Sequence, residues 1–341
     1  MQNSVSPLSH EPVTWRQALR ERLVEFGIRT IWGKGAFPAS MATGIPLIST
    51  GLRMVWLKAL GAVGVQRFVT TSGLGFKFVC HIGDLSEFPF YHRHAFRNEL
   101  AICAAWLQNE AKPVVFDVGA SVGFFCTHLA QMVANGALEI YAFEPVNETF
   151  VKLVQSVERL ALHDRIHPIA AAVLDEAHPV RLQYPQGNSL FAQIIPHEFE
   201  PRPRDSLAHA QGMTLDGFCK SSRVLPTLLK IDVEGCEVAV LRGAQGLLSR
   251  PDRPAIIFEY YPDALRQCGA EPESVRTLLS GYALYYVDDF EGQIMPFGRP
   301  IESLEEIHWG CNLFAVPLLD GFSARWASAS NAANHRIRVN P

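Results

Sequence analysis

The sequence predicts an α/β fold built on a doubly wound, mostly parallel sheet, and two segments carry most of that prediction. In the first, VVFDVGASVG at residues 114–123, an apolar run broken by Asp117 leads into a glycine-containing turn and then a helical pattern. In the second, LLKIDVEGCEVAVLRGA at residues 228–244, another apolar run leads into acidic residues and a helical pattern. Strands that alternate with helices predict a parallel sheet covered on both faces.

Residues 1–110 lack this alternation, so we expect an N-terminal extension that is largely helical. An apolar stripe of helical spacing predicts a helix at residues 15–26, and a short strand is expected at residues 76–82. A helix at residues 96–107 then leads into the core. The apolar window at residues 36–69 is interrupted by charged residues and prolines, so we expect no transmembrane span there. Because it shows no clear basic amphipathic face, we expect a docking helix or a pair of helices rather than attachment to a membrane surface or an enzyme complex.

From residue 111 to about 320 the strands and helices alternate regularly, and this region is predicted to be one domain. We expect, in order, strand 114–118, helix 122–134, strand 138–143, helix 147–160, strands 166–173 and 180–184, strand 228–232, helix 237–248, strand 255–260, helix 272–280 and strands 282–287 and 312–316. The last two strands lack a clear helix between them, which predicts an antiparallel pair at the sheet edge.

Two segments lack a clear period. Residues 185–211 are rich in Pro, His and Arg, and we expect a long loop that serves as a lid or binding loop. Residues 321–341 are expected to form a loose C-terminal tail.

Composition limits the classes of function. The formal net charge of −4 and the lack of a sustained Lys/Arg stripe argue against a general nucleic-acid binder. The seven cysteines are scattered and never form CxxC, which favours free thiols in a reducing compartment over a disulfide framework or a zinc site. The N-terminus has no basic region followed by an apolar one and no charge-free span of transmembrane length follows, so we expect a cytoplasmic protein.

A nucleotide site is predicted where the first two core strands end. Glu144 follows the second strand, where an acid is placed to accept hydrogen bonds from two ribose hydroxyls. Asp117 would repel the pyrophosphate of a dinucleotide, whereas it suits a ligand that carries an ammonium and a sulfonium. The spacing of Gly119 and Gly123 also departs from GxGxxG. These features predict S-adenosylmethionine rather than NAD.

The predicted cofactor-binding residues are Asp117, Gly119, Ala120, Gly123 and Glu144. Gly119 would let the backbone approach the methionine part, and Asp117 would attract its ammonium directly or through water. The alternative for the glycines is close packing of helix on strand. The alternative for Glu144 is an acid that only stabilises the N-terminus of the helix at residue 147.

Four segments, in this order and spacing, resemble the FkbM-type methyltransferase family, a branch of the class I S-adenosylmethionine-dependent enzymes. They are FDVGASVGFF at 116–125, AFEP at 142–145, MTLDGF at 213–218 and LKIDVEGCEVAVLRGA at 229–244. The resemblance covers roughly residues 75–316 and implies a seven-stranded Rossmann-like methyltransferase sheet. It also implies methyl transfer, usually to a hydroxyl of a sugar, a glycan or another secondary metabolite. Cys236 departs from the His or small residue often found there, and Ser121 from the frequent Asn.

Asp232 is the first candidate for a general base, because it ends a strand on the rim that carries Asp117 and Glu144. Lys230 shares its face and would hold it ionised, although the two could instead form a structural pair. Glu259 ends the next strand on the same rim and is the second catalytic candidate. Acids on this rim could ligate Mg²⁺, but we expect no metal site.

Substrate contacts are predicted on both sides of that rim. Glu234 and Glu237 would bind acceptor hydroxyls or begin the following helix. Asn188 and His197 lie in the expected long loop and would reach the substrate from there. The residues at 91–94, YHRH, would line the acceptor site or, more simply, form a surface loop.

The sequence thus predicts an S-adenosylmethionine-dependent O-methyltransferase with a small-molecule or glycan substrate and no nucleic-acid partner. The alternatives are N-methylation, an NAD-dependent oxidoreductase, which Asp117 disfavours, and a non-catalytic methyltransferase-like scaffold module.

Overall fold

A computed structural model describes residues 64–72, 74–81, 96–186, 189, 192–195, 200–287 and 295–339. The chain divides into two compact units, residues 1–70 with 80–83, and residues 71–79 with 84–341. Strands β1 (Arg67–Thr71) and β2 (Lys77–His81) precede the core. The predicted helix at 15–26 and most of the window at 36–69 lie outside the described residues, and the end of that window forms β1.

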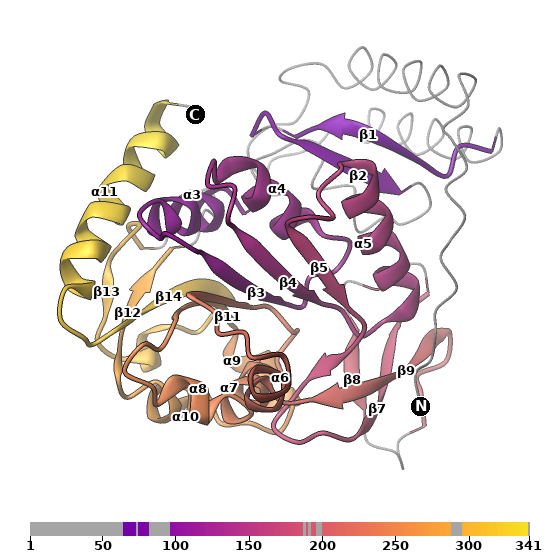
Figure 1. Cartoon of the computed structure of the whole chain (residues 1–341). Helices are drawn as coiled ribbons and strands as arrows, with labels where there is room; N and C mark the ends of the chain where they lie inside the picture. The colour runs from indigo at the N-terminus through magenta and orange to yellow at the C-terminus, as the bar shows by residue number, and fades with distance from the viewer. Residues whose placement is uncertain are drawn as a thin grey trace, which may run out of the picture. The chain divides into compact units, whose positions relative to one another are not determined.

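A large sheet forms the centre of the second unit (Figure 1). Its strand order is β13-β12-β14-β11-β10-β3-β4-β5. The strands are β3 (Val114–Val118), β4 (Glu139–Phe143), β5 (Ile166–Ile169), β10 (Leu228–Ile231), β11 (Ala255–Tyr260), β12 (Tyr282–Tyr286), β13 (Pro300–Ile301) and β14 (Cys311–Pro317). Strands β5, β4, β3, β10 and β11 are parallel, and β14 runs antiparallel to both β11 and β12. The predicted seven-stranded sheet is confirmed, with the two-residue β13 added at its edge.

Helices cover both faces of this sheet, as Figure 1 shows. The helices are α3 (Arg97–Leu107), α4 (Phe124–Met132), α5 (Asn147–Arg159), α6 (Leu215–Ser222), α7 (Glu237–Arg242), α8 (Gln245–Leu248), α9 (Pro262–Gln267), α10 (Glu273–Leu278), the 3₁₀ turn η3 (Leu304–Glu306) and α11 (Phe322–Val339). Within β3, Val115 belongs to the apolar cluster that includes residues of α3, α4 and α11, whereas Phe116 belongs to the cluster that includes residues of α6 to α10. This alternation explains why the strand is apolar at successive positions.

Two predicted helices are shorter than expected because glycines interrupt them. The helix predicted from residue 122 begins at Phe124, since Gly123 adopts φ 88° as its N-cap. The helix predicted at 237–248 divides into α7 and α8 around Gly243. A Cβ on Gly243 would lie 1.9 Å from the carbonyl oxygen of Leu174, so only glycine allows this close approach.

The expectation of a long loop at 185–211 was wrong for the residues that the structure describes. Strands β8 (Gln193–Ile195) and β9 (Asp205–Met213) pair antiparallel with β7 (Pro179–Pro185). With β6 (Ala172–Val173) they form a four-stranded sheet. The side chains of β9 are mostly small or polar, so the segment carries little apolar alternation, and long-range pairing gives it its extended form.

The expectation of a loose C-terminal tail was also wrong, because residues 322–339 form helix α11. Trp326, Ala329 and Ala333 are buried at helical spacing. The Trp326 ring stacks on Tyr285 at 4.2 Å between centroids and on Phe314 at 5.2 Å. The sequence did not reveal the buried face of α11, because its alanines and serines are small and give only a weak apolar period.

Within the described part of the chain, no helix combines the length and the apolar character needed to cross a bilayer.

Candidate functional site

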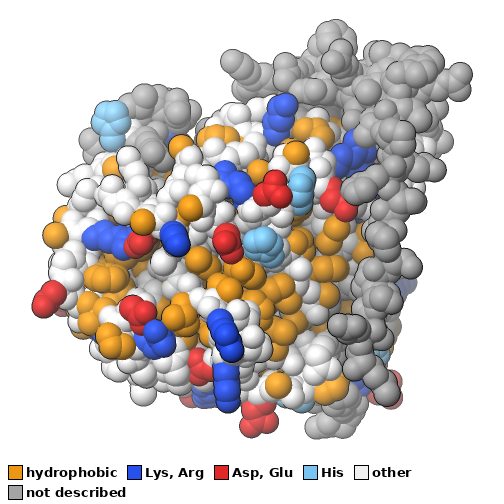
Figure 2. All heavy atoms as spheres, viewed as in Figure 1, with side chains coloured by type: hydrophobic (Ala, Val, Ile, Leu, Met, Phe, Trp, Pro, Cys, Tyr) orange, Lys and Arg blue, Asp and Glu red, His pale blue; other side chains and the backbone are white. Residues whose placement is uncertain are grey.

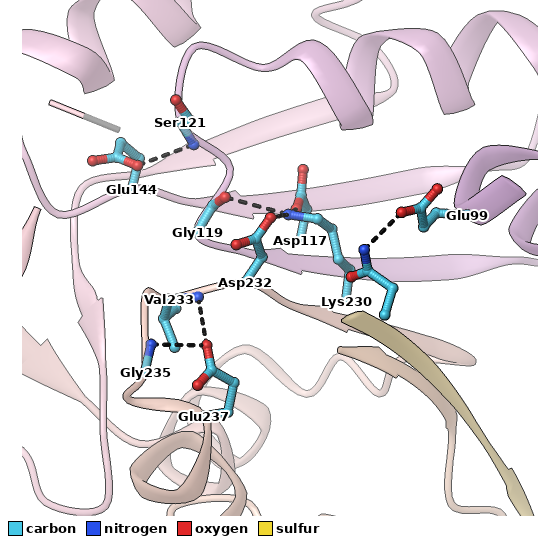
Figure 3. A network of polar contacts seen from close by, with 11 residues as sticks. Glu99, Asp117, Gly119, Ser121, Glu144, Lys230, Asp232, Val233, Gly235 and Glu237 are labelled. Atoms are coloured by element: carbon cyan, nitrogen blue, oxygen red, sulfur yellow. Dashed lines mark hydrogen bonds and ion pairs between the residues drawn. The ribbon is translucent and has the colours of Figure 1, made fainter. Parts of the chain in front are cut away.

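A cavity of about 290 Å³ lies beyond the carboxyl ends of β3, β4, β10 and β11. The carboxyl ends of these parallel strands lie at the same edge of the sheet. A crevice forms at this edge because β4 follows on one side of β3, whereas β10 and β11 lie on its other side. Among the predicted site residues, Gly119, Ala120, Glu144, Asp232, Glu234 and Glu259 line this cavity. Figure 3 shows the polar groups around it.

The loop after β3 is fixed by its backbone. The N–H groups of Gly119 and Ala120 both donate to the carbonyl of Phe143, at 3.1 and 2.9 Å. Gly119 adopts φ 81°, and a Cβ there would lie 1.8 Å from the carbonyl oxygen of Asp232. The absence of a side chain therefore lets this loop contact the end of β10, a contact that the sequence did not reveal.

Gly123 does not line the cavity, because its missing side chain serves the packing of two helices. A Cβ on Gly123 would lie 2.7 Å from Cδ1 of Leu153 in α5. The alternative expectation for the glycines was packing of a helix on a strand, whereas the close approach at Gly123 lies between two helices, α4 and α5. Gly119 and Gly123 thus position a loop whose Ala120, Ser121 and Val122 face the cavity.

Glu144 directly follows β4 and is held in place by two backbone groups. Its Oε2 accepts from the N–H of Ser121 at 3.0 Å, and its Oε1 accepts from the N–H of Val146 at 2.8 Å. Burial raises the pKa of Glu144 to about 7, although these two hydrogen bonds act to lower it. The carboxyl group thus joins the β3 loop to the start of α5 and lines the cavity at the same time.

Asp117 is fully buried and does not line the cavity. It stands beside Lys230 in the register of β3 and β10, and Lys230 Nζ lies 3.2 Å from Asp117 Oδ1. Asp117 therefore does not directly contact a ligand ammonium in the cavity. Its charge acts through Lys230, which does line the cavity.

Lys230 also reaches Asp232, with its Nζ 3.3 Å from Asp232 Oδ2 and 3.4 Å from the carbonyl oxygen of Gly119. The rings of Phe96 and Phe125 flank the ammonium at 5.7 and 5.3 Å. Burial alone would lower the pKa of Lys230, but the charges of Asp117 and Asp232 raise it above its ordinary value. A charged lysine is thus buried against two acids, of which Asp232 keeps a side chain that is 26% exposed.

The loop between β10 and α7 places Glu234 and Glu237 differently. Glu234 adopts φ 54° and lines the cavity. Glu237 is buried beneath the loop, where its Oε1 accepts from the N–H groups of Val233 at 3.0 Å and Gly235 at 3.3 Å (Figure 3). Glu237 is the first residue of α7 and does not line the cavity, so its position matches the alternative expectation that it begins this helix.

Burial and repulsion between acids raise the pKa of two acids that line the cavity. Burial, followed by the charges of Asp232 and Glu237, raises the pKa of Glu234 to about 8. Burial, followed by the charges of Asp232 and Glu234, raises the pKa of Glu259 to about 9. At neutral pH both groups therefore favour the protonated form, which can donate a hydrogen bond.

The sequence did not identify several lining residues. Asn312 lies beside Glu259 across the β11–β14 ladder, and its amide donates to Glu99 Oε1 at 2.7 Å. Apolar side chains complete the wall, namely Phe96, Phe124, Phe143, Val173, Leu182 and Ile194. Phe143 and Phe124 could have been found, since one ends a predicted strand on the rim and the other begins the next helix. Leu182 and Ile194 come from the second sheet, which no local signal places here.

Asn188, His197 and the residues at 91–94 lie outside the described residues, and the predictions made for them stay predictions. Ser189, which the structure does describe, lines the cavity. No group of three or more His, Cys, Asp or Glu side chains in the described ranges is arranged to hold a metal ion.

The family described as the methyltransferase FkbM domain matches residues 117–285. This range contains the β3 loop, Glu144, the Asp232 segment and Glu259. No curated protein sequence matches the chain.

Solved structures similar to the chain share little sequence with it. A methyltransferase FkbM from Methylobacillus flagellatus has 13% identity and a TM-score of 0.38, with 62% of this chain and 47% of that chain covered. The present chain therefore spans about half the length of that protein. A precorrin-6y C5,15-methyltransferase from Geobacter metallireducens has 12% identity and a TM-score of 0.34, over 64% and 84% of the two chains. An O-methyltransferase from Bacillus cereus, solved in complex with SAH, has 11% identity and a TM-score of 0.38, over 86% and 96%.

Proposed function

Because this chain belongs to the FkbM-type methyltransferases, we propose that it transfers a methyl group from S-adenosylmethionine to a hydroxyl oxygen of a sugar, a glycan or another secondary metabolite. The observation that carries the proposal is the pairing of Glu144 and Asp232 in one cavity, on strands that flank β3. One acid is fixed by backbone donors and the other by a buried lysine. Glu144 is thus available to bind the cofactor, and Asp232 is available to the methyl acceptor.

The groups around Glu144 fit the nucleoside part of S-adenosylmethionine. Each of its carboxylate oxygens accepts one backbone N–H and keeps a lone pair for a ribose hydroxyl. Val173, Leu182 and Phe143 provide apolar surface for an adenine ring. A volume of about 290 Å³ is near the lower end of the roughly 300–1,000 Å³ usual for ligand pockets.

S-adenosylmethionine supplies an electrophilic methyl group attached to a sulfonium. Asp232 lines the cavity on the opposite side of β3, and we expect it to take the proton that a hydroxyl acceptor loses. Lys230 positions the Asp232 carboxylate, and the charges of Asp117 and Asp232 keep Lys230 protonated. Alignment of the acceptor with the methyl group in the cavity contributes the rest of the rate.

The lining favours a neutral acceptor rich in hydroxyl groups. Glu234 and Glu259, when protonated, can both donate to and accept from such hydroxyls. Lys230 is the one Lys or Arg among the described residues that line the cavity, and two acids already engage it. A nucleic-acid substrate brings phosphates that call for free cations. On the face seen in Figure 2, moreover, basic side chains are interspersed with acidic ones.

Isothermal titration with S-adenosylmethionine, with its demethylated product and with NAD tests the cofactor. We expect saturable binding of both sulfur compounds and none of NAD. Binding of NAD alone would contradict the proposal, and binding of none of the three by folded protein would point to a non-catalytic scaffold.

A screen of sugars, glycans and amines with labelled methyl donor then tests the acceptor. We expect label on a hydroxyl oxygen that is lost in the Asp232→Asn variant. Label on nitrogen would show that the reaction is N-methylation and not the proposed O-methylation.

A further inference from the structure

Two thiols meet at the edge of the cavity. Cys236 Sγ lies 2.9 Å from Cys268 Sγ, although the residues are 32 positions apart in the chain. Cys236 lines the cavity at the end of the loop that carries Glu234, and Cys268 is the C-cap of α9. Both thiols are reduced, and both residues are half-buried rather than sealed in the core. The mechanism proposed above uses neither of them.

The segments that carry these thiols are in direct backbone contact. Gly235 adopts φ 102°, and a Cβ there would lie 2.5 Å from the carbonyl oxygen of Ala264 in α9. Cys268 Sγ also approaches the carbonyl oxygen of Glu234 at 3.9 Å. The two sulfur atoms are therefore held together by the packing of the loop on α9, and their proximity does not depend on one flexible side chain.

From this geometry we infer that Cys236 and Cys268 are an oxidation site, at which a peroxide forms an intramolecular disulfide that ties the cavity loop to α9. A disulfide bond is about 2.0 Å long, so the sulfur atoms need to move closer by roughly 0.9 Å, which small side-chain rotations allow. The other cysteines are less suited. Cys80, Cys103, Cys126 and Cys311 are buried in the core, and burial raises the pKa of the half-buried Cys219 to about 11.

Either thiol can react first, because each can donate a hydrogen bond to a thiolate on the other. A hydrogen bond from Cys236 stabilises a thiolate on Cys268, at the end of α9. The Cys268 thiolate attacks one oxygen of hydrogen peroxide, the O–O bond breaks, and a sulfenic acid and hydroxide form. The Cys236 sulfur then attacks the sulfenic sulfur, the S–O bond breaks, and water leaves with the thiol proton. In sum, two thiols and one peroxide give one disulfide and two waters.

Peroxide treatment of the full chain, followed by thiol titration and peptide mass mapping without reductant, tests this inference. We expect five of the seven thiols to remain, and one cross-linked peptide pair that joins residues 236 and 268. Dithiothreitol should restore all seven. The cross-link should raise the melting temperature by about 5 °C, because it shortens the free loops of the unfolded chain.

Cys236→Ser and Cys268→Ser should each abolish the cross-linked peptide and the shift in melting temperature. Cys219→Ser is the matched control, since Cys219 is also half-buried, and it should retain both effects. Retention of all seven thiols after peroxide would overturn the inference, as would a disulfide between two copies of the chain. Cofactor binding is not part of the readout, so this result is independent of the proposed reaction.

Discussion

The two sides of the cavity are built on different principles. On the side of Glu144, every charge meets a backbone donor, since the N–H groups of Ser121 and Val146 bind its two oxygens. On the side of Asp232, burial and then the charges of neighbouring carboxyl groups raise the pKa of Glu234 to about 8 and that of Glu259 to about 9. The first side thus holds a single acid between backbone donors, whereas the second gathers several acids that raise one another's pKa.

The sharpest test of this comparison is Asp232→Asn. We expect turnover to fall by about 10²–10⁴-fold, because the group that accepts the hydroxyl proton is lost. The fold should persist, because Lys230 keeps its ion pair with Asp117. Labelled-methyl transfer measures the turnover, and calorimetry should show cofactor affinity that changes little.

Asp263→Asn, an exposed acid on α9, is the control for that experiment. Its turnover should match that of the unmodified protein. If Asp232→Asn also retained full turnover, Asp232 would not be the base, and the crowded side of the cavity would serve binding alone.

Gly119→Ala tests the contact that joins the two sides. The added Cβ would meet the Asp232 carbonyl at 1.8 Å, and φ 81° is unfavourable for alanine. We expect the free energy of unfolding to fall by at least about 2 kcal/mol, as measured by urea denaturation. Gly321→Ala separates the two causes, because Gly321 has φ 82° but a Cβ added there would meet no heavy atom within 4 Å. Equal losses in the two variants would mean that the close approach at Gly119 costs nothing.

Glu144→Ala tests the backbone-fixed side. Loss of its hydrogen bonds to ribose should weaken S-adenosylmethionine binding by about 1–3 kcal/mol, as measured by calorimetry. Glu148→Ala, in the first turn of α5, is the control and should leave affinity unchanged. Unchanged affinity in Glu144→Ala as well would reduce Glu144 to a residue that only orders the turn before α5.

The smallest expected effect is on the pH dependence of stability. The pKa of Glu259 is about 9 in the folded protein and about 4.5 ordinarily, so between these values the folded state binds more protons than the unfolded state. Stability should therefore decrease as pH rises from 6 to 9. Glu259→Gln should reduce that decrease by a few degrees in melting temperature, whereas the exposed Glu302→Gln should not. Identical slopes in both variants would show that Glu259 is not perturbed.

The sequence predicted well where a local pattern is sufficient. Strands β3 and β11 occur at the predicted residues, and Glu144 and Asp232 follow strands as expected. The segments that were mispredicted, β9 and α11, are mostly polar or small, so their form comes from partners distant in the chain. Some site residues also could not be predicted from local patterns. Leu182, Ile194 and Asn312 line the cavity but belong to strands outside the motifs that the sequence analysis used.

By itself the sequence determined the doubly wound sheet, its order of elements and the rim on which the acids lie, because apolar period and turn residues are local properties. Only the tertiary structure decided what each acid does there. Asp117 is buried beside Lys230 and does not line the cavity, and Glu237 lies beneath its loop, where it accepts from backbone N–H groups. Burial and then neighbouring acids raise the pKa of Glu259. Burial and charge separation depend on which residues are brought together by folding, and no local pattern contains that information.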